Sequence, residues 1–333
     1  MISFIEIENF RGVAKGRIDG FTRLNIFIGK NNTGKSTILE ALAIALDPEL
    51  IPSIVKRRGW HGIVTVLSIF RLENINKNIK ISIDDRVVSI EAIVPHMDKI
   101  EFLIKTHKFS EKVLSLNLDI SKNRKKKSVT CYFDSKGEYK LIYQTKTELL
   151  SGENVIFVDN RSIYNQTPLD AYNSIFKHGY KAHERLIKVI NTVYPEIRDI
   201  RLFSEEVGLE VIYERGRVPF FAMGDGFKSA YVYLAYLTSI EGGYILCEEP
   251  ENYQHPSSRK LIVKGIIEAA KRNQIFISTH SLELLDDILA EAQDIDIRFF
   301  VPNLDENGIL TYYSFDKEEA EFRRKELEAD LRG

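Results

Sequence analysis

Cysteine is scarce in this 333-residue chain, and its scarcity excludes two kinds of site. Cys131 and Cys247 are the only two, and they lie far apart in the sequence. Neither a disulfide framework nor a zinc site with the usual ligand spacing can be built from them. A chain without a disulfide pattern is typical of a reducing compartment, so we predict a cytoplasmic location.

Long apolar runs and a net basic charge are also missing. No stretch of about 18 apolar residues occurs, so the sequence predicts no membrane span. The amino-terminal stretch carries Glu6, Glu8 and Arg11 among its apolar residues, which is not the pattern of a signal peptide. The formal net charge is −2, so any contact with nucleic acid would depend on local basic patches.

What the sequence does contain is an α/β series. With 44% hydrophobic and 28% charged residues, its composition is ordinary for a globular protein with one large domain or two lobes. Strand-like and helix-like stretches alternate toward both ends of the chain. We predict strands at 3–8, 24–28, 155–158, 209–213, 218–221, 244–247, 275–278, 297–301 and 309–314, and helices at 36–46, 180–193, 226–239, 257–271, 282–291 and from Lys317 onward.

The middle of the chain, from about 64 to 146, has a different character. Short strand-like stretches recur there, and turn or charge clusters separate them. This pattern predicts an antiparallel sheet with few long helices. The predicted strands are 79–83, 86–94, 100–105, 112–120, 128–133 and 138–143.

One segment matches the phosphate-binding pattern G-x-x-x-x-G-K-[ST] in full, namely Gly29-Lys30-Asn31-Asn32-Thr33-Gly34-Lys35-Ser36. Its glycines let the backbone curl so that successive N–H groups point at an anion, and the helix that follows adds its positive end. Lys35 would reach the β- and γ-phosphates, and Ser36 would supply its hydroxyl to Mg²⁺. An apolar strand before the loop and an apolar-faced helix after it give the context that the motif requires.

A second predicted strand ends in a pair of carboxylates. Residues 244–247 form an apolar strand, and Glu248 and Glu249 follow it directly. In a protein with a phosphate loop, such an acid lies beside the Mg²⁺ on a neighbouring strand. Glu248 is therefore the candidate metal ligand, and Glu249 is the candidate group that polarises the attacking water.

Four stretches together resemble the soluble branch of the ABC ATPases, which holds SMC-type, RecF-like and OLD-type (overcoming lysogenization defect) proteins. Their order and spacing agree with that branch, and they touch both ends of the chain. They are Ile7 to Gly12, which looks like its NFRG start; Gly29 to Thr37, like GxNxxGKST; Glu248 to Pro256, like EEPENHLHP; and Ser278 to Ser281, like its TTHS switch segment.

The resemblance also covers the signature that ABC proteins present to the ATP of a partner subunit. Residues 222–229 fill that place and resemble the MGDG variant of OLD-like members. Gly224 stands where the common form has a serine, so that hydroxyl is missing. The backbone amides near Asp225 and Gly226 could still bind phosphate at the helix start, and Lys228 could add charge.

The resemblance implies a dimer with composite sites. One subunit would hold Mg-ATP and a second would close over it, excluding water and aligning the in-line attack. His280 would contact the γ-phosphate and sense its presence, and hydrolysis would loosen the dimer. The candidate ATP-binding residues are Arg11, Gly29, Asn31, Asn32, Thr33, Gly34, Lys35, Ser36 and Thr37, the metal ligands Ser36 and Glu248, and the catalytic residues Lys35, Glu249 and His280.

Two features depart from the family pattern. Glu248 replaces the usual aspartate, which gives a longer arm to the metal. The glutamine of the Q-loop, which usually links the metal to lobe movement, has two candidates, Gln144 and Gln166.

Two appendages of related proteins have no counterpart in the sequence. It contains no long coiled-coil insertion of the SMC type, and the stretch after His280 is too short for the Toprim nuclease domain of OLD proteins. Asp294 and Asp296 mimic part of the Toprim acidic pair, but we interpret them as a strand edge.

The partner of the ATPase therefore stays open between two classes. Basic runs at Lys56-Arg57-Arg58 and from Arg124 to Lys127 favour a nucleotide-switched clamp on DNA or RNA in repair or defence. The absence of an effector domain favours the alternative, a regulatory switch for a separately encoded nuclease or toxin that needs no nucleic acid.

The predicted fold is α/β, a two-lobed ABC ATPase head with a mixed core sheet, an antiparallel β subdomain and a helical signature lobe. We expect one domain over residues 1–333, because its ATP-binding core is assembled from both ends of the chain. Its parts are a lobe with the phosphate loop and β-rich subdomain (1–150), a helical signature region (151–243), a return to the core sheet (244–316) and a charged helix (317–333).

Overall fold

The computed structural model describes residues 1–123, 125–143, 153–159, 167–177, 179–204, 208–252, 256–325 and 330–332. Its strands are β1 (Phe4–Phe10), β2 (Val13–Asp19), β3 (Leu24–Ile28), β4 (Ile79–Ile83), β5 (Arg86–Ile93), β6 (Val113–Lys122), β7 (Lys125–Asp134), β8 (Tyr139–Tyr143), β9 (Val155–Val158), β10 (Ile197–Ser204), β11 (Gly208–Tyr213), β12 (Gly216–Pro219), β13 (Tyr244–Glu248), β14 (Gln274–Thr279), β15 (Ile297–Leu304) and β16 (Ile309–Asp316). Its α-helices are α1 (Lys35–Leu46), α2 (Ile51–Lys56), α3 (Val64–Leu67), α4 (Met97–His107), α6 (Pro168–Lys177), α7 (Tyr180–Asn191), α8 (Asp225–Ser239), α9 (Pro256–Ala270), α10 (Leu282–Glu291) and α11 (Lys317–Lys325).

A 13-stranded sheet joins most of these strands, in the order β8-β7-β6-β5-β4-β1-β2-β16-β15-β3-β14-β13-β9. Its centre is parallel, because β9, β13, β14, β3 and β15 pair in parallel. The register places Glu248 opposite Ser278 and Thr279 opposite Ile28. The carboxyl ends of β3, β13 and β14 therefore meet at one edge of the sheet.

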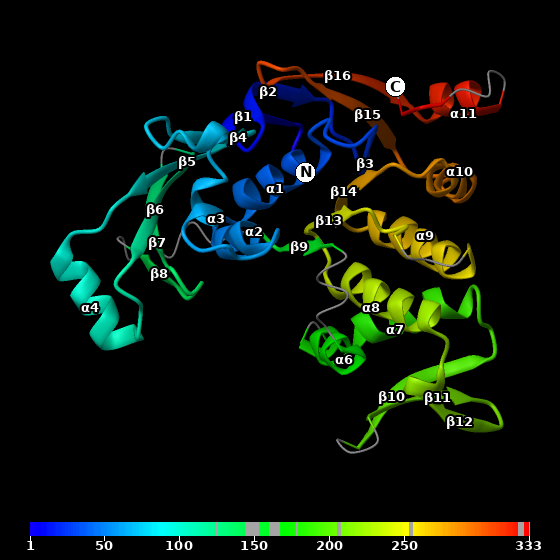
Figure 1. The fold of residues 1–333 in the computed structure, drawn as a ribbon. Coiled ribbons are helices and arrows are strands. Elements are labelled where there is room, and N and C mark those ends of the chain that lie inside the picture. Colours follow the sequence, from blue (N-terminus) through cyan, green and yellow to red (C-terminus); the bar gives the residue numbers. More distant parts are fainter. Residues whose placement is uncertain are drawn as a thin grey trace.

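Both faces of the parallel centre are covered, which explains why its strands are apolar throughout. In β3, Ile26 and Ile28 belong to the core formed with α8, α9 and α10, whereas Phe27 belongs to the core formed with α1. Leu246 and Phe276 lie on the α1 side as well. Figure 1 shows α1 and α8 on opposite sides of this centre.

The strand-rich middle of the chain forms an antiparallel arm, as the sequence predicted. β4, β5, β6, β7 and β8 pair with their neighbours in chain order. The prediction of a strand at 100–105 is wrong, since these residues lie within α4 at the end of the arm (Figure 1). Ile100 and Leu103 are buried one helical turn apart, and Lys108 ends the helix in the left-handed conformation. The apolar residues follow a helical spacing rather than a strand alternation.

A second lobe holds α6, α7 and α8 together with a small sheet in the order β10-β11-β12. The sequence analysis did not predict β2, β10, α2, α3 or α6. Asp294 and Asp296 lie in the turn before β15, with both side chains exposed.

None of the helices that the structure describes is long and apolar enough to cross a membrane.

Candidate ATP site

The phosphate loop lies between β3 and α1, at the edge where the parallel strands end. Three of its residues have positive φ angles, 156° at Gly29, 66° at Asn32 and 97° at Gly34. Gly34 is the N-cap of α1 in the left-handed conformation, which favours glycine because a side chain would be strained there. The curled backbone leads directly into the positive end of a 12-residue helix.

Lys35 is folded back over its own loop. Its Nζ donates to the carbonyl oxygens of Gly29 at 2.7 Å and Lys30 at 2.6 Å. Burial lowers the pKa of Lys35, and the negative charges of Glu249 and Glu251 partly oppose that shift. The ammonium group is therefore already held above the loop by carbonyl oxygens.

A pocket with a volume of about 500 Å³ opens over this loop. It brings together residues from opposite ends of the chain, including most of the predicted ATP-binding residues and the predicted catalytic carboxylate. The lining consists of Arg11, Gly12, Asn31, Asn32, Gly34, Lys35, Ser36, Thr37, Arg58, Glu249 and Leu304.

Glu249 enters this pocket from the end of β13. Its backbone adopts a positive φ of 45°, and its N–H donates to the carbonyl oxygen of Ser278 at 2.8 Å. Both carboxylate oxygens have polar neighbours. Oε2 accepts a hydrogen bond from Asn252 Nδ2 at 2.7 Å, and Oε1 lies 3.2 Å from His280 Nδ1. The structure thus brings the two predicted catalytic residues of this edge into contact.

Glu251 contacts Thr279 and His280 at the carboxyl end of β14. Its Oε1 accepts hydrogen bonds from Thr279 Oγ1 at 2.5 Å and from the His280 N–H at 3.3 Å. Its other oxygen is buried and has no hydrogen-bond partner among the described residues. Burial raises the pKa of Glu251, and these hydrogen bonds only partly oppose that rise.

Glu248 takes part in a different set of contacts. It forms an ion pair with Arg57, whose guanidinium also contacts Asp159 at 2.6 Å and Glu40 at 2.7 Å. Carboxylate and hydroxyl oxygens are the ligands that Mg²⁺ prefers, so Glu248 and Ser36 fit a magnesium site chemically. Arg57 is then the basic neighbour of the candidate metal ligand.

Arg11 lines the pocket, but its donors point into the protein. Its Nε donates to Glu40 Oε2 at 2.9 Å, and its terminal nitrogens donate to the Ile54 carbonyl oxygen at 3.2 Å and to Ser68 Oγ at 3.3 Å. Burial lowers the pKa of Arg11, although the adjacent Glu40 raises it in part. These contacts anchor the loop after β1 against α1 and α2.

The predicted signature residues lie outside this pocket. Gly224 is the N-cap of α8, and the side chain of Asp225 is 98% exposed. Lys228 pairs with Asp225 at 2.7 Å. Since α8 and α1 cover opposite faces of the sheet, the signature and the phosphate loop of one chain belong to separate surfaces (Figure 1).

The first basic run, at Lys56-Arg57-Arg58, is largely paired within the protein. Lys56 Nζ lies 4.8 Å from the ring centre of Tyr139, Arg57 contacts three carboxylates, and Arg58 Nε lies 3.2 Å from Glu40. Arg58 nevertheless keeps 51% of its side chain exposed and faces the ATP pocket.

The second basic run is paired in part. Lys127 lies 3.9 Å from Glu49, and the adjoining Lys122 lies 2.9 Å from Glu153. Arg124 lies outside the described residues. The two patches that the sequence offered to nucleic acid are therefore partly neutralised by the protein itself.

A protein-family model described as "AAA domain, putative AbiEii toxin, Type IV TA system" matches residues 24–286. The chain belongs to this family. An "ATP/GTP phosphatase" of Helicobacter pylori is 24% identical to it over 331 residues, 87% of this chain and 89% of that protein. A "DNA replication and repair protein RecF" of Francisella tularensis subsp. novicida is 27% identical over 122 residues, 37% of this chain and 29% of its own length.

A solved Smc head, bound to the C-winged helix domain of ScpA, shares the fold of this AAA-domain protein. Its TM-score is 0.55 at 14% sequence identity, and the match covers 96% of this chain and 99% of that chain. The predicted α/β ATPase-head fold is thus confirmed. The protein is an ATPase with the fold of an SMC head, and part of its chain is similar to RecF.

Sequence reasoning missed several residues of the AAA-domain pocket. Arg58, Gly12 and Leu304 line it, and Asn252 contacts the candidate catalytic carboxylate. The sequence analysis considered Arg58 only as part of a basic run. Its position soon after the predicted helix that follows the phosphate loop could have indicated a place beside the phosphates. The Q-loop candidates Gln144 and Gln166, and residues 253–255 of the acidic motif, lie outside the described residues.

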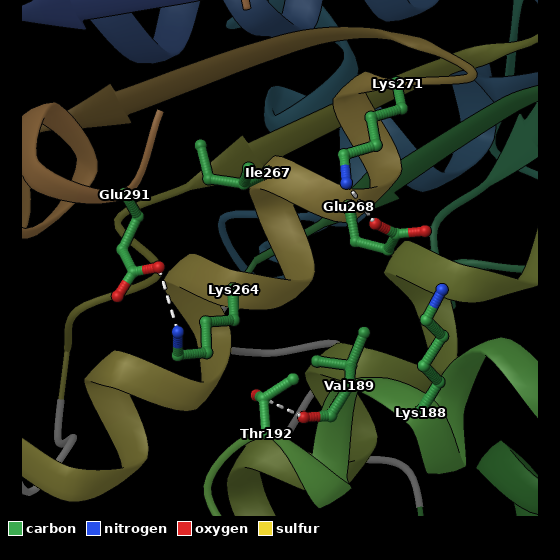
Figure 2. Close-up of a pocket in the computed structure, with 8 residues that line it drawn as sticks. All are labelled: Lys188, Val189, Thr192, Lys264, Ile267, Glu268, Lys271 and Glu291. Atoms are coloured by element: carbon green, nitrogen blue, oxygen red, sulfur yellow. Dashed lines mark hydrogen bonds and ion pairs between the residues drawn. The ribbon is translucent and has the colours of Figure 1, made fainter. Parts of the chain in front are cut away.

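A second pocket of about 220 Å³ lies among α7, α9 and α10, away from all of these motifs (Figure 2). Its charged walls are mostly paired with one another, Lys264 with Glu291 at 2.9 Å and Lys271 with Glu268 at 2.8 Å. Val189 and Ile267 add apolar surface. Because these charges are paired, they produce only a weak electrostatic field that could attract a charged ligand. We therefore assign this pocket no role.

Proposed function

We propose that this ATPase binds Mg-ATP over the phosphate loop and hydrolyses it within an ATP-bound homodimer. The observation that carries the proposal is the division of the motifs between two surfaces. The loop, Lys35 and Glu249 meet in one pocket, whereas residues 224–228 lie on α8 outside it. A second copy of the chain is the natural source of the missing half of the site.

The triphosphate would lie along the backbone amides of the loop. The positive φ angles at Gly29, Asn32 and Gly34 support this role. Residues in this conformation curl the backbone, so that successive N–H groups can point at one anion. Lys35 would exchange its carbonyl contacts for the β- and γ-phosphates. Asn31, Thr33 and Thr37 complete the proposed loop contacts, and Arg11 contributes the wall behind them.

Glu249 is the proposed group that orients and polarises the attacking water. Its carboxylate lines the pocket, and it is held by Asn252 on one side and His280 on the other. Positioning of this kind contributes a large share of the catalysis of phosphoryl transfer. His280 would also sense the γ-phosphate, because it contacts both the catalytic carboxylate and Glu251.

Mg²⁺ would be held by Ser36 and Glu248. When bound, the metal neutralises charge that develops on the phosphate oxygens. Glu248 contacts Arg57 in this structure, so its carboxylate would turn or be shared when the metal site forms. We also propose that residues 1–333 act as one ATPase unit, because β3 and the strands β13 to β15 build the same core sheet.

In the proposed dimer, α8 of each subunit would point its start at the ATP of the other. Gly224, Asp225, Gly226 and Lys228 would then offer amides and one ammonium group to the γ-phosphate. The exposure of Asp225 supports this arrangement, since a buried helix start could not meet a partner. Loss of the γ-phosphate would remove the contact and release the subunits.

The test is the mass in solution of Glu249→Gln with and without Mg-ATP. We expect ATP to convert monomers of this variant into dimers that persist, while wild-type dimers form and dissociate as ATP is consumed. A mass that ATP does not change, with hydrolysis intact in the wild type, would refute the composite site.

Two partners are proposed for the ATP-switched dimer. The first is DNA or RNA, in repair or defence, which the likeness to a RecF protein supports. The second is a separately encoded effector protein. Three observations favour it, namely the internal pairing of the basic runs, the Smc head that was solved with a bound protein, and a family description that names a toxin.

Salt should affect the binding of the two proposed partners differently. Binding of duplex DNA through phosphate contacts weakens steeply as salt rises, because condensed counterions are released. We expect the ATP-locked Glu249→Gln dimer to show that dependence only if nucleic acid is the partner. Absence of DNA binding at low salt, together with co-purification of a protein from a neighbouring reading frame, would favour the effector.

A further inference from the structure

The sequence analysis assigned no role to the side chain of Asn252, yet this side chain contacts the centre of the site. Its amide Nδ2 lies 2.7 Å from Glu249 Oε2, closer than His280 Nδ1, which lies 3.2 Å from Oε1 of the same carboxylate. The Asn252 amide is neutral, so it can hold the carboxylate without neutralising it. A charged donor at this position would compete with the role of Glu249 toward water.

The local backbone explains how the amide reaches this carboxylate. The Asn252 N–H donates to the Glu249 carbonyl oxygen at 3.1 Å, which closes a turn directly after β13. Glu249 has a positive φ of 45° within this turn. The turn therefore places the side chains of Glu249 and Asn252 side by side, three residues apart, at the carboxyl edge of the sheet.

Other contacts hold the same corner without the Asn252 side chain. Glu251 is anchored by Thr279 Oγ1 and by the His280 N–H, and the Glu249 N–H is bonded to the Ser278 carbonyl oxygen. Removal of the Asn252 amide group would leave these bonds and the turn bond in place. The contact of His280 with Oε1 would also remain, so what would be lost is the hydrogen bond that restrains Oε2 of the Glu249 carboxylate.

We propose that Asn252 is a positioning residue for phosphoryl transfer, which fixes the orientation of the Glu249 carboxylate toward the attacking water. This inference rests on the catalytic role proposed for Glu249. With Oε2 tied to Asn252, the carboxylate keeps one orientation, and Oε1 faces the side of His280. Free rotation would reduce the fraction of subunits in which water is aligned with the γ-phosphate.

The first experiment is steady-state ATP hydrolysis by Asn252→Ala. We expect kcat to fall on the order of 10- to 100-fold, the scale that misplacement of a reacting group produces. The KM for ATP should stay within about twofold, because the phosphate loop is untouched. Asn303→Ala, at an exposed position on β15, is the matched control and should retain wild-type kcat.

A structural role is separated from positioning by a double variant. If Asn252 acts through Glu249, adding Asn252→Ala to Glu249→Gln should cause no further loss in single-turnover phosphate release. Asn252→Ser, which keeps a small hydroxyl donor, should recover part of the rate and serves if the alanine variant is unfolded. ATP-dependent dimer formation should persist in each variant, since the signature and the loop are intact.

Three results would overturn the inference. They are an unchanged kcat in Asn252→Ala, a loss that adds in full to that of Glu249→Gln, and a rise in KM that accounts for the whole defect. If Glu249→Gln itself hydrolysed ATP at the wild-type rate, the proposed function would fail first and this inference with it. If Glu249→Gln is inactive and Asn252→Ala is not, only the role of Asn252 is refuted.

Discussion

At the scale of the residue, the site depends on how charges are distributed between the pocket and the protein beneath it. Glu40 on α1 is fully buried and contacts Arg11, Arg57 and Arg58. Buried charges of this kind require partners, because an unpaired one is strongly destabilising. Two of these arginines are therefore engaged below the pocket, while Arg58 keeps an exposed side chain at its rim.

Glu251 gives a prediction about stability and pH. Burial raises its pKa in the folded state, so the folded protein keeps a proton at pH values where the unfolded chain has lost it. Its contribution to stability is therefore greatest below the unfolded pKa and is lost as pH rises through the folded pKa. Glu251→Gln keeps an oxygen for Thr279 and His280 and does not titrate. We therefore compare the free energy of unfolding of Glu251→Gln with that of the wild type. The difference should favour the variant more at pH 8 than near pH 4.5.

The measurement is denaturant unfolding of both proteins at the two pH values. Glu6→Gln is a suitable control, because Glu6 lies at the surface, 4.0 Å from Arg17. A difference in the free energy of unfolding between Glu251→Gln and the wild type that does not change with pH would contradict the prediction.

At the scale of the element, periodicity predicted most of the parallel core but failed where a segment is short or only half buried. The strand at 24–28 matches β3, and the helix at 282–291 matches α10. α4 was mistaken for a strand because Ile100, Phe102 and Ile104 alternate along the sequence, although the residues that the helix buries are Ile100 and Leu103. β10 was missed because most of its residues are exposed or half-exposed, which leaves only a weak apolar alternation.

The start of α8 carries the second prediction. Phe221 precedes the signature and is 73% exposed, so its ring is accessible to a partner subunit. In the proposed dimer it would pack near the ATP pocket of the partner subunit. Phe221→Ala, added to Glu249→Gln, should weaken ATP-dependent dimerisation on the order of 10-fold or more, as truncation of an aromatic anchor does.

Analytical ultracentrifugation across a concentration series would measure this change. Phe203→Ala is the matched control, since Phe203 is 54% exposed on β10, in the small sheet. Equal weakening by both variants would mean that Phe221 has no special place in the interface.

At the scale of the whole molecule, the motifs along the chain predicted most of the residues that line the pocket, but not the contacts between them. The phosphate loop and the acidic strand end lie more than 200 residues apart, and parallel pairing through β14 brings them together. Their motifs are local, so the sequence reveals them. The contact of Arg57 with Glu248 and Asp159 joins a residue just after α2 to the ends of β13 and β9, and no local sequence pattern predicts such a contact.

The division of each site between two subunits leads to the last prediction. Lys35→Ala removes the lysine that would bind the β- and γ-phosphates. Gly226→Asp places a negative charge at the start of α8. That charge is compatible with the helix dipole but would repel the phosphates bound by the partner subunit. Each variant alone should be inactive. In an equimolar mixture, half of the dimers are mixed, and each mixed dimer holds one intact site. Hydrolysis should recover to about one quarter of the wild-type rate if the two sites of a symmetric dimer act independently.

A mixture of Lys35→Ala with Glu249→Gln provides the control for this experiment. Both of these residues line the pocket of the same subunit. Every site in every dimer then lacks one of them, so no activity should return. Recovery in the control would show that subunits do not pair as proposed. Failure of the first mixture, when mass measurements show that mixed dimers form, would mean that α8 does not complete the site of the partner.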